Sequence, residues 1–322
     1  MNIVILGAGA LGSILAAHLI EDGHQVALVA RGQRAKQIRD EGLLVGGLSD
    51  LKVQCQVISE PMAVLDAELL IVTVKTYDIE SAIAPLASRK FDSVFSVANG
   101  VLKNSQLAQC FGAPAVLGCM ADTSGELLAS GEVRFTRNIC LHIGEFDGAL
   151  SHRATAIAEA INHSGVNAIA ENNIQTIEWS KFVGWVALLV LAVSTQRETG
   201  KFLADRNCAH LAATIIHEMA AIAAVKAIKI IDQSPLPVAS LAAKAIDLAE
   251  RQLIEIGNEW KRNAPSHRLS ALQDLQRGKK LEVAETLGFA VGEAKSLGLD
   301  TPTLVTCFSI VSGINGLIEP AS

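Results

Sequence analysis

MNIVILGAGALG, residues 1–12, is the stretch that decides the expected fold class of this chain. An apolar run typical of a β-strand leads directly into the pattern Gly-x-Gly-x-x-Gly, and helix-forming residues follow from Ile14 onward. A strand, a tight turn and a helix in this order form the dinucleotide-binding start of a Rossmann-type fold. The strand is essential to this interpretation, because glycine turns without one are common.

Each glycine of the turn has a separate expected role. Gly7 permits the tight turn, Gly9 leaves no side chain between the backbone and a pyrophosphate, and Gly12 lets the helix pack closely on the strand. The N–H groups at the start of the helix then bind the phosphates. We therefore predict that the cofactor lies against Gly7, Ala8, Gly9, Ala10, Leu11 and Gly12.

The residue after the second predicted strand, 23–30, distinguishes NAD from NADP. An NAD-specific site usually has Asp or Glu there to hold the ribose 2′-hydroxyl, whereas this chain has Arg31, followed by Arg34. Guanidinium groups suit a 2′-phosphate, so we predict NADP as the cofactor. The alternative is two solvated surface arginines, and it applies above all to Arg34.

The composition of the 322 residues favours two domains and a small-molecule partner. The net charge is −6, without a basic cluster, which disfavours nucleic acid. Six cysteines lack any Cys-x-x-Cys spacing, which argues against a zinc site and a disulfide framework. The longest apolar run, 182–193, is shorter than the roughly 20 residues that cross a bilayer, so we expect a buried helix and no membrane partner. Without a basic region before the first strand, we expect no signal peptide and a cytoplasmic protein.

Strand and helix patterns alternate up to about residue 170, and only helical patterns follow. Further strands are expected within 43–58 and at 69–74, 94–97, 115–119, 132–135, 140–143 and 166–170, with helices at 77–88 and 153–163. Residues 132–135 and 140–143 are expected to form an antiparallel hairpin at the sheet edge. The later helices are expected at 174–195, 206–230, 238–260, 279–297 and 303–317.

These patterns predict an α/β protein with a second, all-α domain. Residues 1–172 form an NADP-binding domain with a doubly wound, Rossmann-type parallel sheet, and residues 173–322 form a helical domain. The Ala- and Leu-rich helices of the second domain could supply the face of a homodimer. Lys75 and Asn99 follow two predicted parallel strands, at the carboxyl ends where such sheets bind ligands. The alternative for both is an ordinary polar loop residue.

Lys181 interrupts an apolar seam on the first helix of the second domain. Two interpretations remain open: its stem snorkels to solvent, or a buried site uses its ammonium as a general acid. Glu282, on a later helix, could pair with Lys181 or lie on a solvated face, and the sequence does not decide between them. Histidines without ligand spacing disfavour a metal site, and Ser124 lacks the Gly-x-Ser-x-Gly context of a hydrolase.

Taken together, these motifs resemble the ketopantoate (2-dehydropantoate) 2-reductase family over essentially the whole chain. The resemblance rests on the glycine turn, Arg31, Val-Thr-Val-Lys75, Ala-Asn99-Gly100, Trp179-Ser180-Lys181-Phe182, and Ser270-Ala-Leu-Gln-Asp274 followed by Glu282. It implies NADP in the first domain and a 2-keto acid held against the helical domain.

The resemblance also implies a role for each matching residue. Lys181 would give a proton to the substrate carbonyl oxygen, and Glu282 would orient its ammonium. Lys75 and Asn99 would line the cofactor and substrate site. Ser124 would lie near the cofactor, and Ser270 would hold the substrate carboxylate.

The chain departs from the family pattern beside Lys181. The family has asparagines one and two helical turns later, where this chain has Trp185 and Leu189, and a third at the position of Thr199. Apolar side chains cannot satisfy a buried substrate hydroxyl, which costs about 1–3 kcal/mol when unpaired. We therefore expect weak or altered specificity, for example for a less hydroxylated 2-keto acid. A catalytically silent NADP-binding sensor and another two-domain dehydrogenase are the alternatives.

Overall fold

The computed structural model describes residues 1–318 of the chain, which divides into two compact units. The first unit is Met1–Glu178 and the second is Trp179–Ser322. Helix α6 (Ile174–Thr195) begins in the first unit and continues into the second. The change of unit therefore falls within this helix, a short distance after residue 172.

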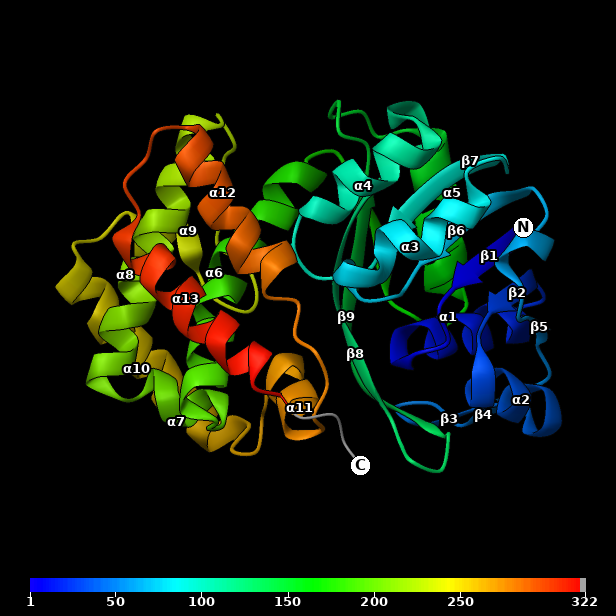
Figure 1. Cartoon of the computed structure of the whole chain (residues 1–322), viewed down its shortest axis with the longest axis horizontal. Coiled ribbons are helices and arrows are strands. Elements are labelled where there is room, and N and C mark those ends of the chain that lie inside the picture. Colours follow the sequence, from blue (N-terminus) through cyan, green and yellow to red (C-terminus); the bar gives the residue numbers. More distant parts are fainter. Residues whose placement is uncertain (319–322) are drawn as a thin grey trace. The chain divides into compact units, whose positions relative to one another are not determined.

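The first unit contains a five-stranded parallel sheet in the order β5-β2-β1-β6-β7 (Figure 1). Its strands are β1 (Asn2–Leu6), β2 (Gln25–Val29), β5 (Gln56–Ile58), β6 (Ala67–Val72) and β7 (Phe91–Ser96). The chain runs outward from β1 first in one direction and then in the other, as in doubly wound sheets. The expected Rossmann-type fold is confirmed.

Alternate residues of the central strands pack on opposite faces of this sheet. In β1, Ile3 and Ile5 join one core with α1 (Ala10–Glu21), whereas Val4 and Leu6 join another with α3 (Ile79–Ile83) and α4 (Leu102–Phe111). Both faces are buried, so the strands are continuous apolar runs. The remaining connections are α2 (Gly32–Glu41) and the 3₁₀ turns Pro61–Ala63, Thr76–Asp78, Ala84–Leu86 and Ala113–Ala115.

A second sheet shares the core of α1, which is therefore buried along most of its length. Its order is β10-β9-β3-β4, with β8 paired to β9. These strands are β3 (Leu43–Gly47), β4 (Leu51–Val53), β8 (Gly118–Leu127), β9 (Val133–Gly144) and β10 (Ala168–Glu171), accompanied by α5 (His152–His163).

The hairpin expected within residues 132–143 is wrong. These residues lie in one long strand, β9, whose antiparallel partner is β8. The polar residues 136–138 continue the strand because Arg137 forms an ion pair with Asp122 across the pair. The β8–β9 register shifts at two places, between Asp122 and Thr123 and between Ser124 and Gly125.

The second unit is helical, as expected, but several of its helices end at other residues than the sequence predicted. Its helices are α7 (Thr199–Leu203), α8 (Arg206–Val225), α9 (Val238–Ala242), α10 (Ile246–Asn263), α11 (Ser270–Gln276), α12 (Phe289–Ser296) and α13 (Pro302–Gly316). The helix expected at 206–230 ends early because Ala227 has a φ of +55° and Ile228 N–H closes back on Ala223.

Two other expected helices of this unit are interrupted. Residues 238–260 form α9 and α10, separated where Ala245 adopts an extended backbone before the second helix. Residues 279–297 begin with a non-helical segment, because the N–H of Leu281 donates to the Asn315 side chain (2.8 Å). A π-helical turn, Ala284–Gly288, then leads into α12.

The expectation that 182–193 is a buried helix is confirmed. The run lies in α6, where 89% of the most apolar window is buried. By length and composition α6 and α8 could both cross a membrane, and in α8 44% of the corresponding window is buried. Burial of α6 in the protein core accounts for its apolar sequence.

Candidate active site

The glycine turn joins β1 to α1, and three neighbours fix its backbone. Gly7 has a φ of +116°, which favours glycine, and its N–H donates to the carbonyl of Val29 on β2 (3.1 Å). Thr73, just after β6, donates its hydroxyl to the carbonyl of Gly7 (2.8 Å). A Cβ on Gly12 would lie 2.0 Å from the Gly7 carbonyl oxygen, so only glycine fits there.

Gly9 is surrounded by open space instead. A Cβ built on Gly9 would meet no atom within 4 Å, and its φ of −73° is one that any residue adopts. The first backbone bond of α1 runs from Ser13 N–H to the Gly9 carbonyl (3.0 Å), so the N–H groups of Ala10, Leu11 and Gly12 precede the hydrogen-bonded ladder. Open space beside such N–H groups fits the pyrophosphate of a dinucleotide.

The two arginines after β2 differ in their surroundings. Arg31 is exposed and precedes α2 as its N-cap residue. Arg34 points back to the turn, where it donates to the Ala8 carbonyl (3.1 Å) and the Ser13 hydroxyl (2.9 Å). It also donates to the Gly131 carbonyl (2.7 Å), and burial lowers its pKa from the ordinary value. Arg34 thus has a structural role at the turn, and Arg31 is the arginine with its side chain in solvent.

The loops that carry Lys75 and Asn99 lie side by side. Lys75 follows β6, Asn99 follows β7, and the hydroxyl of Thr76 donates to the Asn99 carbonyl (3.1 Å). Both predicted residues are half-buried. A Cβ on Gly7 would meet Val74 at 2.9 Å, so the Lys75 loop also lies against the glycine turn. The structure therefore brings these two residues together at one end of the sheet, beside the turn.

Ser124 lies on β8, a strand that packs against α1. Its side chain is exposed, with its hydroxyl 3.4 Å from that of Thr136 on β9. The next residue, Gly125, is so close to α1 that a Cβ there would lie 2.6 Å from Ile14. Ser124 therefore lies beside the first turns of the helix that begins at the glycine turn.

Lys181 interrupts a buried segment of α6. It is partly exposed, whereas Ser180 and Phe182 beside it are buried. The hydroxyl of Ser180 accepts a hydrogen bond from Ile231 N–H (2.9 Å), and Phe182 packs edge-on against Trp179 at 5.8 Å between centroids. From Trp179 to the end of α6, Lys181 is the only charged residue. Its neighbours thus fix the helix while its own side chain reaches the surface in part.

Trp185 and Leu189, the residues at the family's asparagine positions, are both part of the packed interior of the second unit. Trp185 is 6% exposed and Leu189 is 0% exposed. The neighbouring Gly184 admits close contact, because a Cβ there would lie 3.0 Å from Val238. At both positions α6 carries a buried hydrophobic side chain instead of a carboxamide.

Glu282 is buried, at 7% exposure, two residues before the π-helical turn Ala284–Gly288. Thr286 donates its hydroxyl to the Glu282 carbonyl within this turn. π-helical turns are rare and occur frequently at functional sites, and this one sets the direction of the chain after Glu282. Of the two interpretations of Glu282, the solvated face is wrong, because the side chain is buried.

Ser270 is exposed at the start of α11, and the segment before it is tied to α7. Thr199 N–H donates to the His267 carbonyl (3.0 Å), and the Thr199 hydroxyl lies 2.9 Å from His267 Nδ1. The ring of His267 packs edge-on against Trp260 at 4.6 Å between centroids. Thr199, at the third family asparagine position, therefore binds the chain that leads to Ser270.

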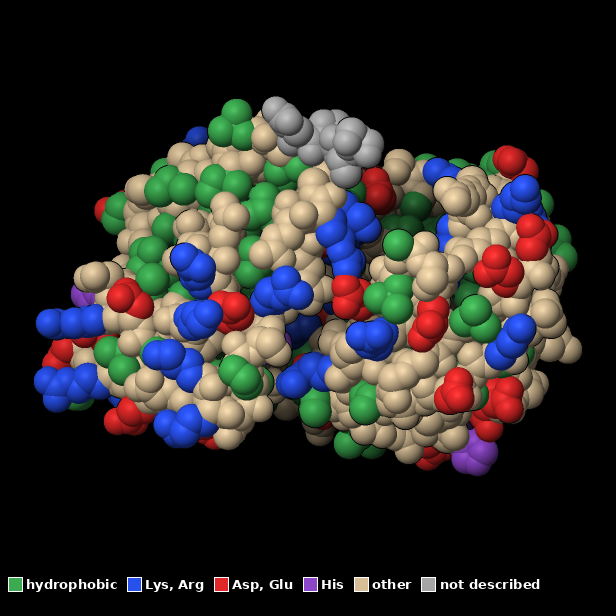
Figure 2. Space-filling model, turned by 90° about the horizontal axis from the view of Figure 1, so that it is seen from below, with side chains coloured by type: hydrophobic (Ala, Val, Ile, Leu, Met, Phe, Trp, Pro, Cys, Tyr) green, Lys and Arg blue, Asp and Glu red, His purple; other side chains and the backbone are tan. Residues whose placement is uncertain are grey.

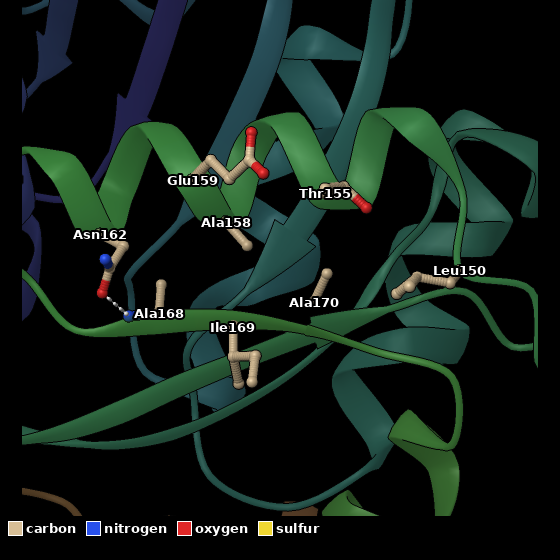
Figure 3. A pocket seen from close by; sticks show the side chains of 8 residues that line it. All are labelled: Leu150, Thr155, Ala158, Glu159, Asn162, Ala168, Ile169 and Ala170. Carbon is tan, nitrogen blue, oxygen red and sulfur yellow. Dashed lines mark hydrogen bonds between the residues drawn. The ribbon is translucent and has the colours of Figure 1, made fainter.

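A groove of about 260 Å³ lies elsewhere in the first unit, between α5 and β10 (Figure 3). Its lining is mostly apolar, with Glu159 as the one charged side chain. Asn162 closes one end, accepting a hydrogen bond from the N–H of Ala168 (3.2 Å). None of the predicted site residues lines this groove, and without a cation it does not suit a phosphate-bearing cofactor.

Within residues 1–318, no group of three His, Cys, Asp or Glu residues could hold a metal ion. On the face shown in Figure 2, Lys and Arg are interspersed with Asp and Glu. All six cysteines are free, and burial raises the pKa of Cys55 to about 11.

Sequence reasoning missed the polar residues that hold the site's backbone. Thr73 and Thr76 bond to the carbonyls of Gly7 and Asn99, and Lys103 donates to the carbonyl of Ala98 (2.9 Å). The only available signal was that Thr73 and Thr76 follow the end of β6 by one and four residues and that Lys103 lies in α4. That placement does not say which distant carbonyl a side chain will reach.

Comparisons with known proteins match both parts of the chain. A family model described as ketopantoate reductase PanE/ApbA matches residues 3–148, and its C-terminal counterpart matches residues 173–315. A 2-dehydropantoate 2-reductase of Archaeoglobus fulgidus is 30% identical over 315 residues, covering 97% of each chain. A protein of the same name from Pyrococcus horikoshii is 25% identical and covers 98% of each chain.

Solved structures show the same fold. A PanE/ApbA family ketopantoate reductase from Ralstonia eutropha JMP134 superposes with a TM-score of 0.83 at 24% identity, covering 98% of this chain and 99% of its own. The ternary structure of a D-mandelate dehydrogenase with NADH and anilino(oxo)acetate has a TM-score of 0.84 at 18% identity, covering 99% of both chains.

Proposed function

The chain belongs to the ketopantoate reductase PanE/ApbA family, and from this premise we propose that it reduces a 2-keto acid to a 2-hydroxy acid with NADPH. The observation that carries the proposal is the open space at Gly9 beside the N-terminus of α1, in a chain that both family models match. Ketopantoate is the substrate that the curated relatives' names favour. We assign cofactor binding to residues 1–172 and substrate binding mainly to residues 173–322, in a cytoplasmic protein that forms a homodimer.

The exposed position of Arg31 supports NADPH over NADH. The Arg31 side chain lies in solvent after β2, where the adenosine ribose binds in this fold, whereas Arg34 is engaged by the turn. A guanidinium there would pair with a 2′-phosphate through two parallel hydrogen bonds. When bound, the dinucleotide supplies the hydride.

The other steps belong to the protein's own residues. The N–H groups at the start of α1 hold the pyrophosphate, and Lys75 and Asn99 line the nicotinamide and substrate end. Lys181 protonates the carbonyl oxygen of the substrate as that oxygen gains negative charge, and Ser270 binds the carboxylate. The buried Glu282 orients the Lys181 ammonium. A positioned cation stabilises the developing alkoxide by its charge and then by its proton.

The buried Trp185 favours a second candidate substrate. Trp185 at 6% exposure and Leu189 at 0% are packed in the interior, so neither position offers the carboxamide that the family uses for a substrate hydroxyl. A less hydroxylated 2-keto acid would lose less than ketopantoate from the missing carboxamides, because the ketopantoate hydroxyl would be unpaired. A silent NADP-binding sensor is the alternative if no acid turns over.

The test is NADPH oxidation over a panel of 2-keto acids that includes ketopantoate and acids with apolar side chains. Wild type is expected to turn over at least one of them. Lys181→Ala should lower kcat by about 10²–10⁴-fold, the usual contribution of a general acid, without changing NADPH affinity. Lys201→Ala is the control, because Lys201 is an exposed lysine of α7 that pairs with Glu198. Full activity of Lys181→Ala would exclude Lys181 as the proton donor, and NADPH binding without turnover would favour the sensor.

A further inference from the structure

Lys103 and Glu178 form an ion pair in the interior of the first unit. Their charged atoms, Nζ and Oε1, are 3.3 Å apart, and the side chains are 2% and 3% exposed. Lys103 lies on α4 and Glu178 on the first turns of α6. Nothing in the proposed chemistry uses either residue, although a fully buried ion pair is rare among charged groups.

Both charged groups also form hydrogen bonds with backbone groups, and Glu178 forms one with a side-chain amide. Glu178 accepts hydrogen bonds from the Asn104 side chain (2.6 Å) and from Cys119 N–H (3.0 Å). Lys103 donates to the carbonyls of Ala98 (2.9 Å) and Cys119. The pair thus joins four segments: the loop after β7, helix α4, the start of β8, and the start of α6.

Such a pair is expensive to bury and is weak evidence for stability. Burial raises the pKa of Glu178, and Lys103, Asn104 and Cys119 N–H oppose that rise. An apolar pair of similar volume would often be as stable or more stable. The presence of the charges therefore calls for a reason other than stability, and directional hydrogen bonding is the one that the geometry offers.

The two ends of the network lead to two predicted site residues. The carbonyl that Lys103 binds belongs to Ala98, the residue before Asn99. Glu178 precedes Lys181 by three residues on α6, which is about one helical turn. The same buried pair therefore fixes the backbone beside Asn99 and the helix that carries Lys181.

We propose that Lys103 and Glu178 are positioning residues for the reduction, which hold the Asn99 loop and the first turns of α6, the helix that continues to Lys181. The proposal rests on the proposed function of Asn99 and Lys181. Neither charge touches the substrate. Their effect is on the placement of the residues that do, and misplacement by about 1 Å can cost roughly a hundredfold in rate.

The test compares Glu178→Gln and Lys103→Met with the double variant Lys103→Met/Glu178→Leu. Each single variant leaves one buried charged group without its partner and should lose stability. The double variant should recover only part of this loss, because Cys119 N–H and the carbonyls of Ala98 and Cys119 still lose a partner. Positioning predicts that kcat stays about 10–100-fold low in the double variant, with the KM for NADPH within about twofold of wild type. Arg153→Met/Glu145→Gln, which removes a partly exposed ion pair of the same unit, is the matched control and should keep wild-type kcat.

Backbone amide hydrogen exchange gives a readout that does not need turnover. In all three variants, exchange should rise about tenfold at both 98–100 and 179–183, relative to the rest of each unit. Wild-type kcat in the double variant, or a rise at only one of the two segments, would overturn the proposal. If wild type reduces no 2-keto acid, the proposed function fails, and the paired rise in exchange still decides whether the network couples the two segments.

Discussion

The glycine turn of the first unit and the Lys181 segment of the second specify their chemistry in opposite ways. At the turn, the absence of side chains on the glycines is what matters. A Cβ on Gly12 would collide with the Gly7 carbonyl, and Gly9 leaves open space beside α1. On α6, one partly exposed lysine is present among buried apolar neighbours. The comparison teaches that the proposed cofactor site is built from backbone geometry, whereas the proposed substrate site depends on the identity of individual side chains.

The largest effect is expected from a substitution at Gly12, where glycine is needed for packing of the turn itself and not only for the approach of a ligand. Gly12→Ala places a methyl group 2.0 Å from the Gly7 carbonyl oxygen and should lower the free energy of unfolding by about 1–3 kcal/mol. NADPH affinity should fall as well, because the turn must shift. Chemical denaturation and fluorescence titration with NADPH measure the two effects.

Gly9→Ala is the matched control for this substitution. Its methyl group meets no protein atom, so the free energy of unfolding should change by less than about 0.5 kcal/mol. NADPH affinity should nevertheless fall by about tenfold or more, equivalent to about 1.4 kcal/mol. Unchanged affinity in Gly9→Ala would show that the open space is not where the pyrophosphate binds.

Substitution of Arg31 or Arg34, the two arginines after β2, is expected to have an intermediate effect on cofactor affinity or stability. Arg31→Ala should weaken NADPH by about tenfold while leaving NADH and stability nearly unchanged, since each charge-assisted hydrogen bond contributes about 1.5–3 kcal/mol. Arg34→Ala should instead lower stability by about 1–3 kcal/mol, because the carbonyls of Ala8 and Gly131 lose a donor. Titration of each variant with both cofactors checks this. Equal loss of NADPH and NADH in Arg31→Ala would contradict a 2′-phosphate contact.

The smallest effect concerns an ion pair outside both regions. Arg153 donates two hydrogen bonds to Glu145 and holds the pKa of that carboxyl below its ordinary 4.5. Because the folded-state pKa is lowered, the pair stabilises the fold above about pH 4.5 and loses this contribution as the pH falls through the folded pKa. Glu145→Gln should therefore cost less than about 1 kcal/mol at pH 7 and less still at pH 3. Urea unfolding at the two pH values measures it, and a cost that grows on acidification would contradict the assignment.

Prediction from sequence was most successful where structure depends on local pattern. The apolar runs of β1, β6 and β7 and the limits of α6 follow from uninterrupted hydrophobic periodicity. It was less successful where a residue distant in the chain decides the local structure. At Leu281, the N–H donates to the Asn315 side chain instead of continuing a helix. Residues 132–143 became one strand for the same reason, because Asp122 on β8 pairs with Arg137.

The sequence by itself determined the glycine turn, the alternation of strand and helix, and the place of Lys181 in an apolar helix, because each is encoded by neighbouring residues. The tertiary structure alone decided which arginine remains in solvent, that the Lys75 and Asn99 loops are joined through Thr76, and that Glu282 is buried. It also paired Lys103 with Glu178, 75 positions apart in the chain. Side-chain partners of this kind are set by the packing of distant elements, and no local pattern records them.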